Sequence, residues 1–160
     1  MTVHTNKTGT VESVTTALPT ATNGSAVSAG DLDFTAAGSN ANLREMLFGR
    51  IRGTLKWATV TNIGAGTVIA DVYFVPKLDG SNPPQIDTTA GTSFIPATYR
   101  VGELIAARIP TANTATIFDS RWFELHAEKV TVYLLNRSGQ TWNASNDGVV
   151  DIRVESAQSN

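Results

Sequence analysis

Cysteine is absent from this 160-residue chain, and charged residues are scarce. The lack of cysteine excludes disulfides, thiolate metal sites and a cysteine nucleophile. Charged residues make up 16% of the chain, against roughly 25% in typical soluble domains, and the formal net charge is −2. This balance gives no general electrostatic attraction to nucleic acid or to an anionic membrane surface. We therefore expect neither of them as a partner.

Histidine is also rare, with only His4 and His126 in the chain. Histidine is the most frequent general base and a common metal ligand, so a two-histidine site is not expected. Glu124 and His126 share one face of the predicted strand "WFELHA", but residues two apart on a wet strand face are usually solvated neighbours. No nucleophile elbow, Walker loop, dinucleotide fingerprint or zinc-ligand spacing is present. The sequence predicts a protein that is not an enzyme and that holds no cofactor or metal.

Long apolar runs are missing as well. No run approaches the roughly 18 residues that a membrane-spanning helix needs, and the N-terminus lacks the basic and then apolar pattern of a secretion signal. The default expectation is the cytoplasm of the producing cell. The length fits one domain with a substantial hydrophobic core.

Small polar residues dominate the N-terminal stretch "TVHTNKTGTVESVTTALPTATNGSAVSAG". We predict an extended N-terminal arm over residues 1–35, followed by a folded domain over residues 36–160. Ordering backbone costs roughly 1 to 2 kcal/mol per residue, and the few aliphatic side chains of the arm bury little area against their own domain. We therefore predict that the arm is a tether between subunits, held by strand addition to a neighbour, with Val11, Val14 and Leu18 as contact residues.

Apolar and polar residues alternate with a period of two in most of the remaining chain, as in "TVIADVYFVP", "KVTVYLL" and "GVVDIRVES". Turn-forming residues separate these segments, and only "NANLREMLFG" has the pattern of a short helix. The pattern predicts an all-β fold, either a two-sheet sandwich or a barrel. The long link "KLDGSNPPQIDTTAGTSFIPATYRVG" favours a crossover between sheets, and therefore a single jelly-roll-like β-sandwich rather than an up-and-down barrel. The cysteine and tryptophan spacing of immunoglobulin domains is absent.

Positive charge is concentrated in the predicted strand "GRIRGTLKWATVTN". Its outward row contains Arg50, Arg52 and Lys56, opposite an inward row of Ile51, Leu55 and Trp57. Two interpretations remain open. The row is either a solvated face that protects a strand edge from self-pairing, or a surface that meets an acidic neighbour in an assembly.

The chain contains three tryptophans. Trp57 and Trp122 lie within strand patterns and are predicted to be core residues. Trp142 lies in the loop "SGQTWNASNDG" beside several amides, and it is the candidate for contact with a sugar or with a protein interface.

A Thr-, Ser- and Ala-rich arm, a cysteine-free jelly-roll-like domain with the strands "GTVIADVYFVP", "KVTVYLLN" and "GVVDIRVES", and the lack of a catalytic set together resemble the capsid decoration, or cement, proteins of tailed bacteriophages. The resemblance implies a structural virion protein on the capsid surface, made in the host cytoplasm. It implies binding to the major capsid protein and to copies of itself, often as homotrimers, so that capsomers are bridged.

Two other classes remain open at this point. One is a phage receptor-binding or carbohydrate-binding β-sandwich module, which would share the fold and would use loop aromatics. The other is an enzyme on a jelly-roll scaffold, which typically gathers histidines and a carboxylate around a metal.

Overall fold

The computed structural model of the chain describes residues 4–15, 19–33, 48–57, 59–77, 86–121, 123–124, 129–143 and 150–159; for β1, β7, β10 and residues 33, 48, 49 and 143 it describes the backbone alone. The strands are β1 (His4–Thr15), β2 (Ala26–Asp33), β3 (Phe48–Trp57), β4 (Val68–Pro76), β5 (Arg100–Ala106), β6 (Thr116–Ser120), β7 (Phe123–Glu124), β8 (Lys129–Asn136), β9 (Trp142–Asn143) and β10 (Val150–Ser159). A short 3-10 turn, η2 (Ala97–Tyr99), precedes β5. The described part of the chain contains no α-helix, and the prediction of an all-β fold is confirmed. The predicted short helix falls mostly outside the described residues.

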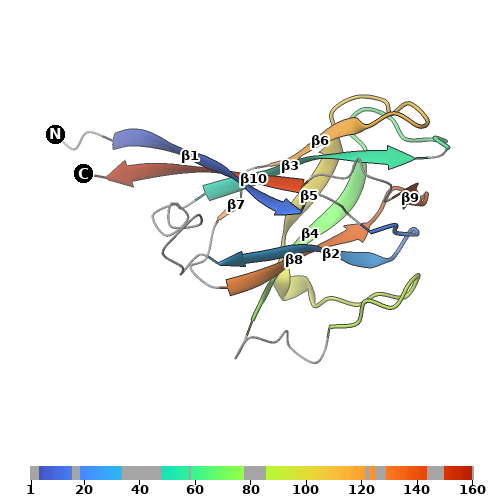
Figure 1. The fold of residues 1–160 in the computed structure, drawn as a ribbon, viewed down its shortest axis with the longest axis horizontal. Coiled ribbons are helices and arrows are strands. Elements are labelled where there is room, and N and C mark those ends of the chain that lie inside the picture. Colours follow the sequence, from blue (N-terminus) through green and yellow to red (C-terminus); the bar gives the residue numbers. More distant parts are fainter. Residues whose placement is uncertain are drawn as a thin grey trace.

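The strands form one antiparallel sheet in the order β1-β10-β3-β6-β5-β4-β8-β2, with β7 and β9 pairing along β3. The sheet curls around a core between β3 and β2, while β1 and β10 lead together to the end where both termini lie (Figure 1). Every strand pair in the described residues is antiparallel.

Burial in β3 follows the predicted period of two. Ile51, Leu55 and Trp57 are buried, whereas Arg50 and Arg52 are half-buried and lie on the opposite face. Pairing of β3 with β10 on one edge and with β6 on the other places the strand inside the sheet, with its inward face toward the core. The predicted distinction between an inward apolar row and an outward basic row is confirmed.

The main core fills the inside of the curled sheet. Its largest fully buried side chains are Trp57, Trp142, Phe118, Leu32, Ile51, Leu55, Ile69, Leu104 and Leu134. A core of this kind stabilises the fold by removing apolar surface from water, at about 25 cal/mol per Å². With no cysteine in the chain, this packing and the strand ladders hold the described residues together.

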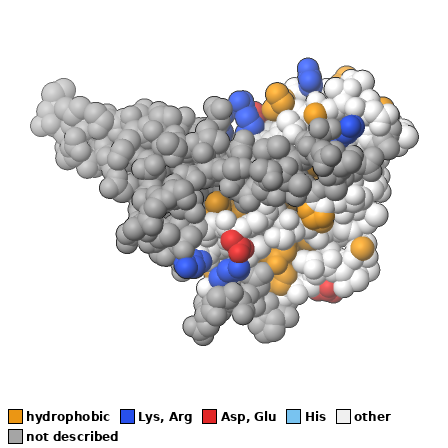
Figure 2. All heavy atoms as spheres, in the orientation of Figure 1, with side chains coloured by type: hydrophobic (Ala, Val, Ile, Leu, Met, Phe, Trp, Pro, Cys, Tyr) orange, Lys and Arg blue, Asp and Glu red, His pale blue; other side chains and the backbone are white. Residues whose placement is uncertain are grey.

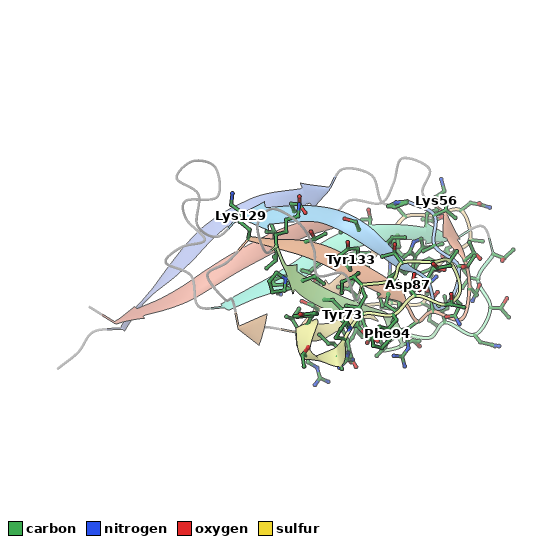
Figure 3. The ribbon with its side chains drawn as sticks, turned by 90° about the horizontal axis from the view of Figure 1, so that it is seen from below. Lys56, Tyr73, Asp87, Phe94, Lys129 and Tyr133 are labelled. Carbon is green, nitrogen blue, oxygen red and sulfur yellow. The ribbon has the colours of Figure 1, made fainter. Side chains whose placement is uncertain are left out.

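A second, smaller core lies on the outer face of β4 and β8. Tyr73 and Tyr133 are directly paired neighbours there, and Ile95 packs against them from the link that precedes β5. Asp87 and Phe94, labelled in Figure 3, form a small β-bridge in that link, and Ile86, the neighbour of Asp87, also packs against this core. Residues 86–99 of the link therefore cover this half of the outer sheet surface.

The predicted crossover in that link is wrong. A crossover between sheets was expected from its length, but the link joins β4 to β5, which are hydrogen-bonded neighbours. Its length serves instead to cover apolar and aromatic side chains on the outer face of the sheet.

The predicted arm also needs correction. Residues 26–33 form β2, which pairs with β8, and Ala21, Ala29 and Leu32 are buried in the main core. The boundary between arm and domain therefore lies before residue 19 and not at residue 35. The small side chains of Ala21 and Ala29 give little apolar pattern in the sequence, although both are buried.

The earlier part of the arm forms β1, which pairs with β10 of the same chain. Its backbone hydrogen bonds thus have a partner within the chain, whereas the tether hypothesis assigned them to a neighbouring subunit. The side chains of Val11 and Val14, and the whole of Leu18, lie outside the described residues. Their role as contact residues stays a prediction.

Candidate functional site

The end of the sheet opposite the termini consists of loops, which we call the apex: residues 19–25, 59–67, 107–115 and 137–141 (Figure 1). The apex sequences contain Arg108 and Arg137 and no Asp or Glu, although the whole chain has 14 acidic and 12 basic residues. The apex is therefore poor in charge and free of carboxylates. Any chemistry there rests on these two guanidinium groups and on apolar, amide, hydroxyl and backbone groups.

Asn136, at the end of β8, organises one side of the apex. Its Nδ2 donates to the carbonyl oxygens of Ala21 at 2.9 Å and Gln140 at 2.7 Å. Its Oδ1 accepts from the backbone N–H of Ser138 at 2.9 Å and from the Ser138 hydroxyl at 2.7 Å. Asn136 is fully buried, so each of these bonds satisfies a group that water cannot reach. They tie the 137–141 loop to the segment before β2.

Gln140 connects that loop to the 59–67 loop. Its Oε1 accepts from the backbone N–H of Thr61 at 3.1 Å, and its Nε2 donates to the Thr61 carbonyl oxygen. Nearby, the indole N–H of Trp57 donates to the Ser138 hydroxyl at 3.4 Å. A single side chain that pairs with both backbone groups of one residue fixes the two loops relative to each other.

The 107–115 loop is tied to its neighbours through the backbone. The N–H of Asn113 donates to the Trp57 carbonyl oxygen at 2.8 Å, and the N–H of Ala106 donates to the Thr67 carbonyl oxygen at 3.0 Å. Asn113 has a φ of 58° and Asn62, in the facing loop, has a φ of 62°. Asparagine tolerates this left-handed region better than most residues. The tight turns on both sides are thus set by residues suited to them.

A groove lies between the 59–67 and 107–115 loops. It is lined by Val60, Asn62, Ile63, Gly64, Ile109, Pro110, Thr111 and Ala112. Ile63 is buried, whereas 66% of Ile109 is exposed. An exposed aliphatic side chain on a fixed rim, with apolar groups beneath it, is the kind of surface that accepts an apolar side chain from a partner.

The structure contradicts the predicted role of Trp142. Trp142 has no exposed surface, lies in β9 opposite Trp57, and donates its indole N–H to the Pro19 carbonyl oxygen at 3.2 Å. A ring in this position contacts neither sugar nor a partner protein. Its amide-rich neighbours gave it the pattern of a loop residue, while its own ring closes the core between β3 and Ala21.

The basic row on β3 is partly neutralised within the chain. Arg52 Nε lies 2.8 Å from Asp119 Oδ1, and Arg52 Nη2 lies 3.2 Å from Asp119 Oδ2. These hydrogen bonds, and then the charge of Asp119, raise the pKa of Arg52. Arg50 and Lys56 are half-buried on the same face, and Lys56 lies at the apex end of β3 (Figure 3). The row is therefore a mixed-charge surface.

A second charged group, which the sequence did not lead us to expect, lies on the outer face of β4 and β5. Asp71 is buried, and its two oxygens accept from Arg100 Nη2 and from Arg137 Nη1, each at 2.7 Å. The bonds to Asp71 and then Glu103 raise the pKa of Arg100. The sequence does contain a signal for this cluster, an acidic residue inside the apolar run "VIADVYFV". A carboxylate that is buried with such a strand needs cationic partners. Asp71, Arg100, Glu103 and Arg137 therefore form an ion cluster that stabilises the fold.

The described residues offer no group of three or more His, Cys, Asp or Glu side chains placed to hold a metal ion. Within the same ranges, no helix has the length and apolar character to cross a bilayer. Trp122 and His126 lie outside the described residues, so their predicted roles stay predictions. The chain matches no family model, no curated protein and no solved structure.

Proposed function

We infer that this chain is a non-enzymatic structural protein that binds the outer surface of a phage capsid through the apex groove and helps to bridge capsomers. The docking part of this proposal rests on one observation. The open apolar groove is held between loops that side-chain and backbone hydrogen bonds fix in place. The capsid part rests on the resemblance of the arm and strands to phage decoration proteins.

The strand pairing supports the finer assignment of a jelly-roll sandwich. β1 pairs with β10, β2 with β8, β3 with β6 and β4 with β5. The first half of the chain thus pairs with the second half in nested order, from the outermost strands to the innermost. Winding one long antiparallel hairpin into two facing sheets produces this nesting, and jelly rolls are built in that way.

The rigidity of the apex loops supports a docking role. Ordering loops on binding costs free energy, and a surface that is already ordered avoids that cost. The side chains of Asn136 and Gln140 already order the apex. The occupant we propose is a surface segment of the major capsid protein in which an apolar side chain lies next to a carboxylate. The apolar side chain fits the groove beside Ile109, and the carboxylate can pair with Arg108, the preceding residue of the same loop; Arg137 already pairs with Asp71.

The carbohydrate-binding alternative has lost its candidate residue, because Trp142 is buried. The open apolar rim of the groove is aliphatic, whereas sugar sites commonly present an aromatic ring.

Purified virions of the phage that encodes the chain test the capsid part. We expect mass spectrometry and immunogold labelling to find the protein on the outside of the head in many copies. Its absence from purified virions would overturn the proposal.

The variant Ile109→Asp tests the docking part. A carboxylate in the groove removes an apolar contact and adds unfavourable desolvation, so we expect co-sedimentation with capsids to weaken by at least tenfold. Ile117→Asp, which changes an exposed isoleucine of β6 outside the groove, is the matched control and should bind capsids normally as a single copy. Equal binding by Ile109→Asp and the unaltered protein would show that the groove is not the docking surface.

A further inference from the structure

The outer surface of β3, β6 and β5 carries an exposed isoleucine in the middle of a regular sheet. Residues of β6 alternate between buried and accessible, and 46% of Ile117 is exposed. Ile117 lies directly opposite Thr54 of β3, and Ile105 of β5 lies opposite Asp119, the next outward residue along β6. These side chains share one outward face, which we call the β3–β6 face.

Charges of both signs border this apolar centre at fixed places. Arg52 and Asp119 are cross-strand partners and form a bidentate ion pair. Lys56 lies on the same face of β3, on the other side of Thr54. A surface that carries a cation on one strand and an anion on the next presents complementary charges to a rotated copy of itself.

We propose that a second copy of this chain covers the β3–β6 face in an isologous pair. A twofold axis parallel to the strands, between β3 and β6, places Arg52 of each copy over Asp119 of the other. The same rotation places each Ile117 over Thr54 of the opposite copy. The apolar centre is then shielded from water and the charges form an alternating ring of Arg and Asp.

The other half of the same sheet surface shows what a covered face looks like in this protein. Over β4 and β8 the chain supplies its own cover, residues 86–99, and the tyrosines beneath it are buried. Over β6, the described residues supply no such cover to Ile117, which remains exposed. A purely acidic partner fits less well, because the Arg52 charge is already matched by Asp119.

This inference does not depend on the apex groove or on a capsid. It concerns the free protein and a different surface. The two proposals therefore fail separately: Ile109→Asp tests the groove, and Ile117→Asp tests the pair.

The test is sedimentation velocity of the full chain over a range of concentrations. We expect a reversible monomer–dimer equilibrium, weakened about tenfold or more by Ile117→Asp and unchanged by Ile109→Asp. Circular dichroism of both variants shows whether the strand content is kept. A full chain that is monomeric at every concentration, or an association that Ile117→Asp leaves intact, would overturn the proposal.

A charge exchange separates contacts between copies from contacts within one copy. In Arg52→Glu and in Asp119→Arg, the ion pair is lost both within each chain and between like chains, so each variant alone should be monomeric. In a mixture of the two variants, the introduced glutamate of one chain faces the introduced arginine of the other at one contact. The unaltered Arg52 and Asp119 face each other at the second contact, and we therefore expect a heterodimer. If the mixture stays monomeric while both variants remain folded, the Arg52–Asp119 contact between copies does not exist.

Discussion

The outer surface of the curled sheet has two halves that differ in what covers them. Over β4 and β8 the link before β5 covers Tyr73 and Tyr133 through Ile95 and Ile86, the chain neighbours of Phe94 and Asp87, which Figure 3 labels. Over β6 the described residues supply no such cover, and Ile117 is exposed next to the Arg52–Asp119 ion pair. Strands with a similar alternation of apolar and polar residues thus have a buried outer face at β4 and β8 and an accessible one at β6. The difference arises because residues 86–99 cover β4 and β8.

The apex adds a third kind of surface. In the space-filling view of Figure 2, coloured hydrophobic side chains form small separate areas, and basic side chains are scattered among uncharged atoms. Among the described residues, Ile109 at the apex and Ile117 on β6 are exposed large hydrophobic side chains that a partner could contact.

Replacing equivalent residues on the two halves of the sheet surface should give the largest contrast. Tyr73→Ala removes a ring from beneath the link, and we expect it to lower the free energy of unfolding by about 3 kcal/mol, within the range for large core truncations. Ile117→Ala should change it by no more than about 0.5 kcal/mol in the monomer, because the side chain is half exposed. Urea unfolding at a concentration that keeps the protein monomeric measures both. Equal losses would mean that the two halves are covered alike.

Asn136→Ala should have a smaller effect on stability and a larger one on the apex. The substitution removes the side-chain hydrogen bonds to Ala21, Ser138 and Gln140, and we expect a loss of about 2 kcal/mol, because buried partners are left unsatisfied. Amide hydrogen exchange should speed up first in residues 137–141, while β4 stays protected. Gln140→Glu is the matched surface control and should loosen only the contact with Thr61. Uniform acceleration across the sheet would contradict a local role for Asn136.

The covered half should also respond to alkaline pH, with the smallest effect of the three. Burial, and then the negative charge of Asp71, raises the pKa of Tyr73 above its usual value. A group whose folded pKa is raised contributes stability below its unfolded pKa of about 10 and loses that contribution as the pH rises through the folded pKa. We expect the free energy of unfolding to fall more steeply above about pH 10 in the unaltered protein than in Tyr73→Phe. Parallel curves would show that Tyr73 ionises freely.

The order of residues along the chain is enough to show which side chains of each strand share a face, because the period of two is a property of extended backbone. It is also enough to predict that the fold is all-β, and that Ile51, Leu55 and Trp57 point away from Arg50 and Arg52 on β3. The exclusion of disulfides likewise follows from the chain alone.

Which faces are covered, and which distant residues meet, emerges only from the folded chain. Trp142 looks like a loop residue until Ala21 and Trp57, both far away in the sequence, pair with β9. Residues 26–33 look like a flexible arm until β8 pairs with them, since small residues give little apolar signal in the sequence. Asp71 acquires Arg100 and Arg137 only when β4, β5 and the end of β8 lie side by side. The period of two is a local property of the chain. The covering of a sheet face, the pairing of strands and the neutralisation of a buried charge depend on contacts between segments far apart in the sequence. For that reason only the tertiary structure shows the groove at Ile109 and the exposed position of Ile117.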